Sequence, residues 1–150
     1  MEDGLLIDPT GAPADWSAPP TVGNVRVESR PDGTLEARTR DVTLTVGRSG
    51  GGLQSVELFL AALGSCMVGT MLTYARTSGV ALDGVRLELE PVLAESRGRV
   101  AEVRLWLRVD GEIEPRRVAA LRRAAEQCKL HATLEQPVVL SLEVEHGPVV

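Results

Sequence analysis

Apolar residues in this chain form one long uninterrupted stretch and several short alternating ones. In the long stretch, from Ser55 to Thr77, the only acidic residue is Glu57, and apolar side chains go all the way round a helical wheel. A helix that is apolar on every side is buried, in a protein core or in a membrane. Gly79 can end this helix. The pattern therefore predicts a long central helix over residues 55–77.

Six shorter segments alternate apolar and polar residues, which is the period of two that β-strands show. Three of them precede the long helix, and the turn residues Pro31-Asp32-Gly33-Thr34 join the first two. Two more follow the helix. An amphipathic helix beginning at Pro115 then precedes the last strand. The predicted strands cover residues 22–29, 35–38, 42–46, 85–90, 100–109 and 138–145.

This order of strands and helices predicts an α+β fold in which helices cover an antiparallel sheet. Residues 1–21 are rich in Pro, Gly, Asp and Ala, which favours an extended N-terminal arm, and residues 22–150 are expected to form a single domain. The central helix is too apolar for a monomer of this size. We therefore expect its exposed side to meet a second copy of the chain.

The composition argues against several kinds of partner. The 150 residues carry a net charge of −5, which disfavours nucleic acid or anionic lipid. The long helix has the length of a membrane span. However, small and hydroxyl residues dilute it, and Arg48 and Arg76 flank it on both sides, which leaves no charge bias to orient it. No secretory signal is visible in the acidic first residues. We therefore expect a cytoplasmic protein that binds neither membranes nor nucleic acid.

The candidate chemistry begins with Cys66, in the middle of the long helix. Burial in apolar surroundings raises a thiol pKa, so a reactive Cys66 needs a cation from elsewhere in the chain. Arg48, in the glycine-rich loop before the helix, is the nearest candidate, and Glu57 could hold its guanidinium through a bidentate pair. A simpler interpretation stays open for each residue. Cys66 could be an inert core residue, and Glu57 could be a first-turn acid that favours the helix.

The second cysteine, Cys128, is followed by Lys129 and His131, which could lower its thiol pKa and suit it to forming or breaking a disulfide. Cys128 and His131 could also supply two zinc ligands. No CxxC or HxxxH partner completes such a site, so we expect no metal and no other cofactor.

Two segments around these cysteines resemble one protein family. The run from Gly51 to Cys66, which includes Val56-Glu57-Leu58-Phe59, resembles the first signature of the OsmC/Ohr family, named for osmotically inducible protein C and organic hydroperoxide resistance protein. The run Cys128-Lys129-Leu130-His131-Ala132-Thr133-Leu134 is similar to the second signature, C-P-x-S-x-x-L. The resemblance covers residues 22–145. Glu57 stands one position later than in the best-characterised peroxidases, as in the broader OsmC-like branch, and Lys129 replaces a proline.

The resemblance implies an interleaved homodimer, with antiparallel sheets wrapped around long central helices and active sites at the subunit interface. It also implies a reaction. Cys66 attacks the peroxide and becomes a sulfenic acid, Cys128 condenses with it to a disulfide, and a dithiol reductant resets the pair. An arginine and a glutamate would activate Cys66. Here Arg48 fits the arginine best, Arg30 is a weaker candidate, and Glu57 is the glutamate. No metal, haem or flavin takes part.

Three hypotheses about function follow. The first is a thiol peroxidase that reduces organic hydroperoxides, an antioxidant enzyme of the oxidative stress response, with Cys66 peroxidatic and Cys128 resolving. The second is a binding or stress-related module that keeps an apolar pocket but has weak or no peroxidase turnover. The third is a structural dimer with inert cysteines.

Overall fold

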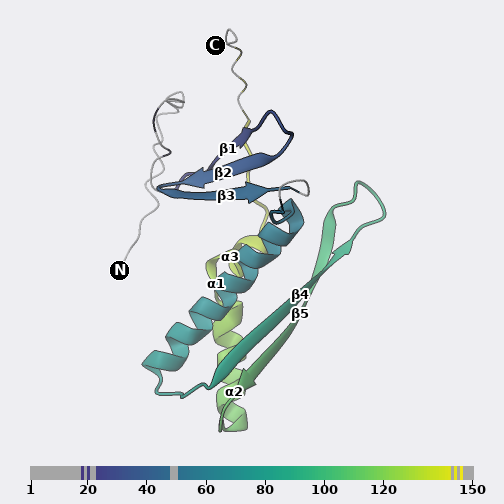
Figure 1. Ribbon diagram of the computed structural model, residues 1–150. Helices are drawn as coiled ribbons and strands as arrows, with labels where there is room; N and C mark the ends of the chain where they lie inside the picture. The colour runs from purple at the N-terminus through teal and green to yellow at the C-terminus, as the bar shows by residue number, and fades with distance from the viewer. Residues whose placement is uncertain are drawn as a thin grey trace. The chain divides into compact units, whose positions relative to one another are not determined.

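The computed structural model describes residues 18, 20, 23–47, 51–142, 144 and 146 (Figure 1). The chain divides after Leu58 into two compact units, and each is described by itself. Most of the arm predicted for residues 1–21 lies outside the described residues. The division into an arm and a single domain therefore stays a prediction.

The first unit contains a three-stranded antiparallel sheet in the order β1-β2-β3, as the alternating pattern predicts. The strands are β1 (Arg26–Ser29), β2 (Leu35–Thr39) and β3 (Val42–Val46). The first strand is shorter than predicted, because residues 23–25 lie outside the ladder.

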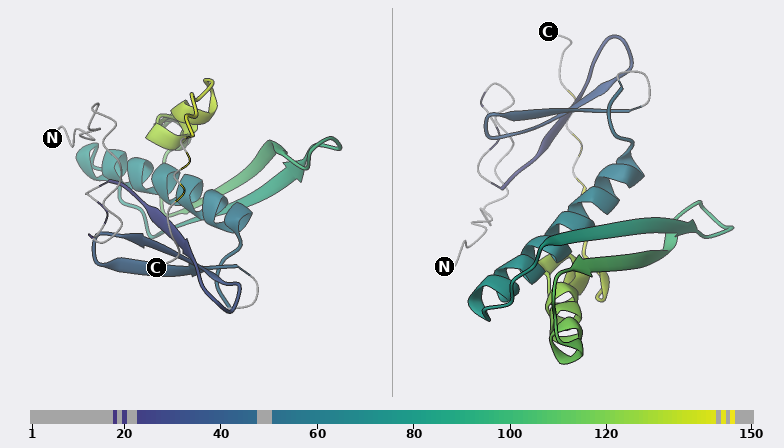
Figure 2. Two further views of the ribbon diagram at one scale, coloured as in Figure 1. Left: turned by 90° about the horizontal axis from the view of Figure 1, so that it is seen from above. Right: turned by 60° about the horizontal axis from the view of Figure 1, so that its bottom comes forward.

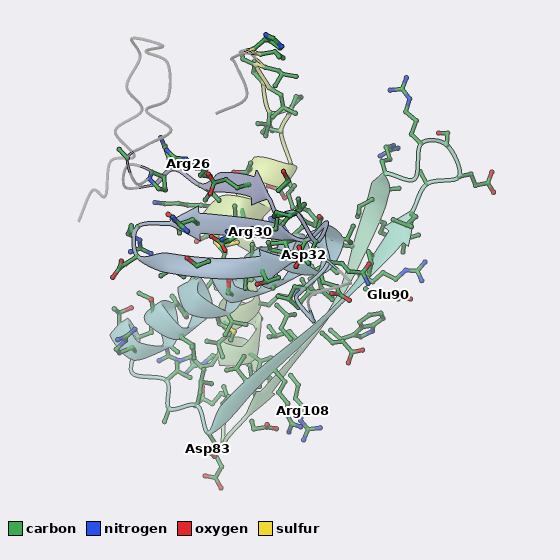
Figure 3. The ribbon with its side chains drawn as sticks, turned by 45° about the horizontal axis from the view of Figure 1, so that its top comes forward. Arg26, Arg30, Asp32, Asp83, Glu90 and Arg108 are labelled. Carbon is green, nitrogen blue, oxygen red and sulfur yellow. The ribbon has the colours of Figure 1, made fainter. Side chains whose placement is uncertain are left out.

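The turn between β1 and β2 has the geometry its residues favour. Gly33 adopts a φ of +83°, which a side chain would disfavour, and its N–H donates to the carbonyl of Arg30 at 3.0 Å. The Asp32 carboxylate accepts from the N–H of Thr34 at 2.9 Å and from its hydroxyl at 2.6 Å. Figure 3 labels Arg30 and Asp32 at this end of the sheet.

The long helix α1 (Ser55–Thr77) has the bounds that the sequence predicts. The helix ends just before Gly79, the residue that the sequence analysis expected to terminate it. Gly79 has a φ of +68°, and the N–H of Val80 donates to the carbonyl of Ala75 at 2.9 Å, which closes the last turn.

Within a single chain one side of α1 is exposed, and the expectation that a second copy covers this side stays a prediction. Phe59 and Leu72 are 38% and 41% exposed. By length and composition α1 also passes as a membrane span, although its buried stripe packs against protein. The stripe is narrow because the strands and helices after α1 cover only one of its faces. The buried residues on it recur every three or four positions: Leu60, Leu63, Gly64, Met67, Met71 and Ala75.

A long antiparallel hairpin lies beside α1 in the second unit, formed by β4 (Gly84–Leu93) and β5 (Val100–Asp110). Its side chains alternate as predicted, so one face is apolar and the other is charged. Glu90 and Arg108 belong to the charged face and point away from the helices (Figure 3). The apolar face packs on the helical core through Val85, Leu87, Leu89, Val103, Leu105, Leu107 and Val109.

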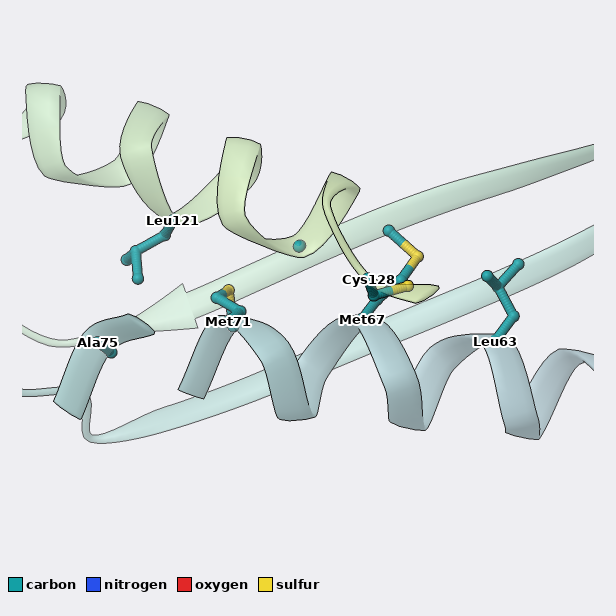
Figure 4. Packing of buried hydrophobic residues seen from close by; sticks show 7 residues of the cluster. Leu63, Met67, Met71, Ala75, Leu121 and Cys128 are labelled. Carbon is teal, nitrogen blue, oxygen red and sulfur yellow. The ribbon is translucent and has the colours of Figure 1, made fainter. Parts of the chain in front are cut away.

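Two further helices complete the second unit, α2 (Pro115–Glu126) and α3 (Lys129–Leu134). The first is the predicted amphipathic helix, and the second was not predicted. Both lie on the same side of the hairpin as α1 (Figure 2). The core forms where α1 meets α2, and Met71 and Leu121 are fully buried in it (Figure 4).

The strand predicted for residues 138–145 is not formed in the part of it that the structure describes. Residues 138–142 pair with no other strand. Their alternation is that of a strand, but Leu140 and Leu142 are 90% and 88% exposed. A strand needs a neighbour for its backbone hydrogen bonds, and the described part of this chain supplies none.

Candidate functional site

Two cysteines from distant parts of the sequence meet at the start of α3. Cys66 lies in the middle of α1 and is half-buried, whereas Cys128 lies between α2 and α3 and is only 1% exposed. Both are free thiols. The two thiols lie close enough for each to shift the pKa of the other. The fold thus brings together two sulfurs that are 62 positions apart in the sequence.

Cys128 is held in place by capping α3. Its backbone is extended, with a φ of −67° and a ψ of 154°, and its Sγ accepts a hydrogen bond from the N–H of His131 at 3.2 Å. The first N–H groups of a helix have no partner inside the helix. Here a sulfur takes the position that a Ser, Thr, Asp or Asn oxygen takes in most helix caps.

Two other backbone N–H groups of this first turn, those of Lys129 and Leu130, act on the thiol of Cys66. Both lower its pKa. Burial alone would raise the pKa of Cys66. The N–H of Leu130, the thiol of Cys128, and the N–H and positive charge of Lys129 together lower that pKa below its ordinary value. Cys66 is therefore the sulfur that the site favours as a thiolate.

The pKa of Cys128 is shifted in the opposite direction, above its ordinary value. Burial raises the pKa of its thiol, and the N–H of His131 lowers it less than burial and the neighbouring Cys66 raise it. The expectation that Lys129 and His131 lower the pKa of Cys128 is therefore wrong in its net result. The charge of Lys129 acts on Cys66 instead. The pKa of Cys66 is thus lowered and that of Cys128 raised, so Cys66 is the more readily ionised of the two.

Glu57 caps its own helix. Its carboxylate accepts a hydrogen bond from the backbone N–H of Gln54 at 2.8 Å, and the residue is exposed. Gln54 also begins the helix, since its carbonyl accepts from the N–H of Leu58 at 2.8 Å. Cys66 follows nine residues later, a rise of about 13 Å along a helix. Glu57 could therefore act on Cys66 only through a third group.

The arginine that the sequence analysis selected for this purpose, Arg48, lies outside the described residues, so its role stays a prediction. Arg30 is a second arginine before the helix, and it forms an ion pair with Glu36 on the three-stranded sheet.

His131 contributes its backbone to the site while its ring has a separate environment. The ring Nδ1 is buried without a well-aligned hydrogen bond, although Oε1 of Glu135 lies 3.4 Å from it. Among the described residues, no group of three His, Cys, Asp or Glu side chains is close enough to hold a metal ion.

A largely apolar cavity of about 500 Å³ lies inside the second unit. Its polar residues are Arg122, Glu126 and His131, and Arg122 is paired with Glu126 at 3.2 Å. Neither cysteine is among its lining residues. The apolar wall comes from α1, α2 and the hairpin, through Met67, Val68, Leu87, Leu105, Leu107, Val109, Val118, Leu121 and Ala125.

The sequence analysis missed the effect of Lys129 and Leu130 on Cys66. Lys129 could have drawn attention, because it is the only lysine among the 16 basic residues of the chain and it directly follows Cys128. Nothing in the sequence distinguishes Leu130. A backbone N–H leaves no trace in a sequence unless the local fold is known.

Comparison with known proteins gives one family and one fold. The family model described as OsmC-like protein matches residues 48–143. An OsmC like protein from Mycoplasma pneumoniae has a similar structure, with a TM-score of 0.69 and 13% identity over 75% of this chain and 86% of that one. A hypothetical protein from Aquifex aeolicus VF5 gives a TM-score of 0.67 and 18% identity over 75% and 86% of the two chains.

A third similar structure is that of an organic hydroperoxide resistance protein OsmC from Legionella pneumophila. Its TM-score is 0.52 and its identity 18%, over 74% of this chain and 87% of that one. No curated protein sequence matches this chain. At these identities, the likeness to the solved structures is evidence of a shared fold alone.

Proposed function

The chain belongs to the OsmC-like protein family, and on this premise we propose that it is a thiol peroxidase that reduces organic hydroperoxides. One observation carries the proposal. The two thiols lie close enough to shift each other's pKa, and the pKa of the half-buried Cys66 is lowered. The name of the similar Legionella protein, an organic hydroperoxide resistance protein, supports the substrate class.

The proposed reaction has three balanced steps. The Cys66 thiolate attacks the outer oxygen of R–O–OH, the O–O bond breaks, and the alkoxide takes a proton to leave as R–OH while Cys66 becomes a sulfenic acid. The Cys128 thiol then attacks the sulfenic sulfur, which forms the S–S bond and releases water. A dithiol reductant finally exchanges with this disulfide, is itself oxidised to a disulfide, and restores both thiols.

The environments of the two sulfurs suit these separate roles. A nucleophile must be ionised and reachable, and Cys66 has a lowered pKa and is only half-buried. A resolving thiol needs only to be adjacent, and Cys128 is buried, has a raised pKa and lies close enough to Cys66 for each thiol to act on the other. Arg48 and Glu57 remain proposed members of the site, with Glu57 acting on Cys66 through Arg48.

We also propose that the working form is a cytoplasmic homodimer. The exposed apolar residues of α1 and of residues 138–142 support an interface, because large exposed apolar side chains that gather on a surface mark association sites. Proteins of this family are generally soluble, which supports the location.

The test uses the full chain, reduced and then freed of reductant, with cumene hydroperoxide and dithiothreitol as substrates. We expect catalytic loss of peroxide, no loss above background with Cys66→Ser, and full activity with Ser65→Ala, an exposed neighbour on α1. With Cys128→Ser we expect one rapid turnover and a sulfenic acid that dimedone traps. Wild-type protein that does not consume peroxide, or a fully active Cys66→Ser variant, would refute the proposal.

The second candidate function is binding of an apolar ligand with weak or no turnover, and the cavity of about 500 Å³ favours it. This function predicts saturable binding of an uncharged apolar fluorophore to wild type and to Cys66→Ser alike. It also predicts weaker binding after Leu107→Trp, which would fill the cavity. Rapid peroxide turnover without such binding would exclude it.

A further inference from the structure

A second, smaller cavity lies beside the apolar cavity of the second unit. Its volume is about 290 Å³, against about 500 Å³ for the larger one, and its lining is also mostly apolar. Among the described residues, Leu105 and His131 line both cavities. The first belongs to β5 and the second to α3. These two side chains therefore separate the cavities.

The boundary between the cavities falls within one turn of α1. Leu63 lines the smaller cavity and Met67 lines the larger, and the two residues lie one turn apart on the buried face of the helix (Figure 4). Cys66 belongs to this turn. A molecule that extends from one cavity into the other therefore passes the part of α1 that carries Cys66.

The ring of His131 is held less firmly than its backbone. The backbone N–H donates to Sγ of Cys128 at 3.2 Å. The ring Nδ1, in contrast, is buried without a well-aligned hydrogen bond, and Oε1 of Glu135 lies 3.4 Å from it. Rotation of this ring about its side-chain bonds would join the two cavities into one channel.

The charges around the cavities disfavour an anionic ligand. Their linings contain one guanidinium and three carboxylates, those of Arg122, Glu102, Glu126 and Glu135. Arg122 is already paired with Glu126 at 3.2 Å. Arg104, which lies outside both linings, pairs with Glu102 at 3.1 Å. Negative charge remains in excess, and the exposed Glu102 and Glu135 place it where the smaller cavity opens to solvent.

We propose that the two cavities together bind an elongated, uncharged apolar molecule, and that His131 limits its length. The inference rests on the second candidate function, ligand binding in the larger cavity, and adds to it the class of ligand and the residue that selects the ligand. The larger cavity alone has the size of a small-molecule pocket, about 300–1,000 Å³. A chain too long for it must displace the His131 ring.

The first experiment measures how affinity depends on chain length. Straight-chain primary alcohols compete with an uncharged apolar fluorophore for the reduced, full-length protein. Each methylene that is buried should tighten binding about four-fold. In wild type the affinity should stop rising once the chain reaches the His131 ring. His131→Ala keeps the backbone N–H that holds Cys128, and it should extend the rise to longer chains.

Two further variants separate this effect from a general change in folding. Leu105→Ala opens the boundary from the hairpin side and should also extend the rise. Thr133→Ala shortens a side chain of α3 that lies in neither lining, so it should behave as wild type. The same limiting length in all four proteins would overturn the inference and leave the second candidate function intact. Wild type that binds none of the alcohols would refute both.

The second experiment tests the charge of the ligand. Carboxylic acids of the same chain lengths, ionised at neutral pH, should bind wild type more weakly than the alcohols. Glu135→Gln removes a carboxylate beside His131 and should narrow this difference about two- to five-fold, the range for an exposed charge pair. Glu95→Gln, at the exposed tip of the hairpin, is the matched control. Carboxylates that bind wild type as tightly as the alcohols, or an unchanged difference in Glu135→Gln, would overturn the ligand class.

Discussion

The backbone N–H of His131 donates to Sγ of Cys128 at 3.2 Å, so one cysteine is both a helix cap and a member of the proposed redox pair. The hydrogen bond fixes the sulfur at the end of α3 nearest Cys66. The buried thiol therefore has a structural role before any reaction takes place. Oxidation to a disulfide would change this cap. A bridged sulfur is a weaker hydrogen-bond acceptor than a thiol, and it has no proton with which to donate a hydrogen bond.

The capping role predicts a difference between two substitutions of Cys128. Serine keeps an acceptor for the His131 N–H and a donor for Cys66, whereas alanine keeps neither. We expect Cys128→Ala to lower the free energy of unfolding by about 0.5–2 kcal/mol relative to Cys128→Ser. Urea denaturation of both variants under reducing conditions measures this difference. Equal stability would contradict the cap.

The pKa shifts predict the order in which the two thiols react. Cys66 has a lowered pKa, so its thiolate persists to lower pH, and its alkylation rate should reach half of its maximum at a lower pH than that of an ordinary thiol. Cys128 has a raised pKa and is buried, so its rate should reach half of its maximum at a higher pH than that of an ordinary thiol. Single-cysteine variants, labelled over a pH series and quantified by mass spectrometry, separate the two curves. Reversal of the order would contradict the assigned roles.

Burial on one face of α1 predicts unequal effects for two neighbouring residues. Met71 is fully buried between α1 and α2, and its change to alanine should cost about 2–5 kcal/mol of unfolding free energy. Leu72 is 41% exposed, and its change to alanine should cost the single chain less than about 1 kcal/mol. Chemical denaturation at two protein concentrations checks both values. A concentration-dependent loss for Leu72→Ala would indicate instead that this side chain lies in the proposed dimer interface.

The segment after α3 predicts where dimerisation can be broken. Leu140 and Leu142 are almost fully exposed, and Ser141 lies between them. If a second copy covers this segment, Leu140→Asp combined with Leu142→Asp should yield a monomer because it places charge in an apolar interface. Ser141→Asp is the matched control and should leave the dimer intact. Analytical ultracentrifugation distinguishes the two, and a wild-type protein that is already monomeric would disprove the homodimer.

The sequence determined the elements whose cause is local. The bounds of α1, the alternation along β4 and β5, and the turn at Gly33 all follow from side-chain periodicity and backbone preference over a few residues. The resemblance further selected the two cysteines as a pair.

Only the tertiary structure decided which residues of these elements come together in space. Cys66 meets Cys128 across 62 residues because α2 returns along α1, and no local pattern encodes that approach. Two of the groups that lower the pKa of Cys66 are backbone N–H groups, which no sequence pattern marks and which only the fold places beside a given sulfur. The prediction for residues 138–145 failed for a related reason. A strand is completed by a neighbour, and its own residues cannot specify whether the same chain provides one.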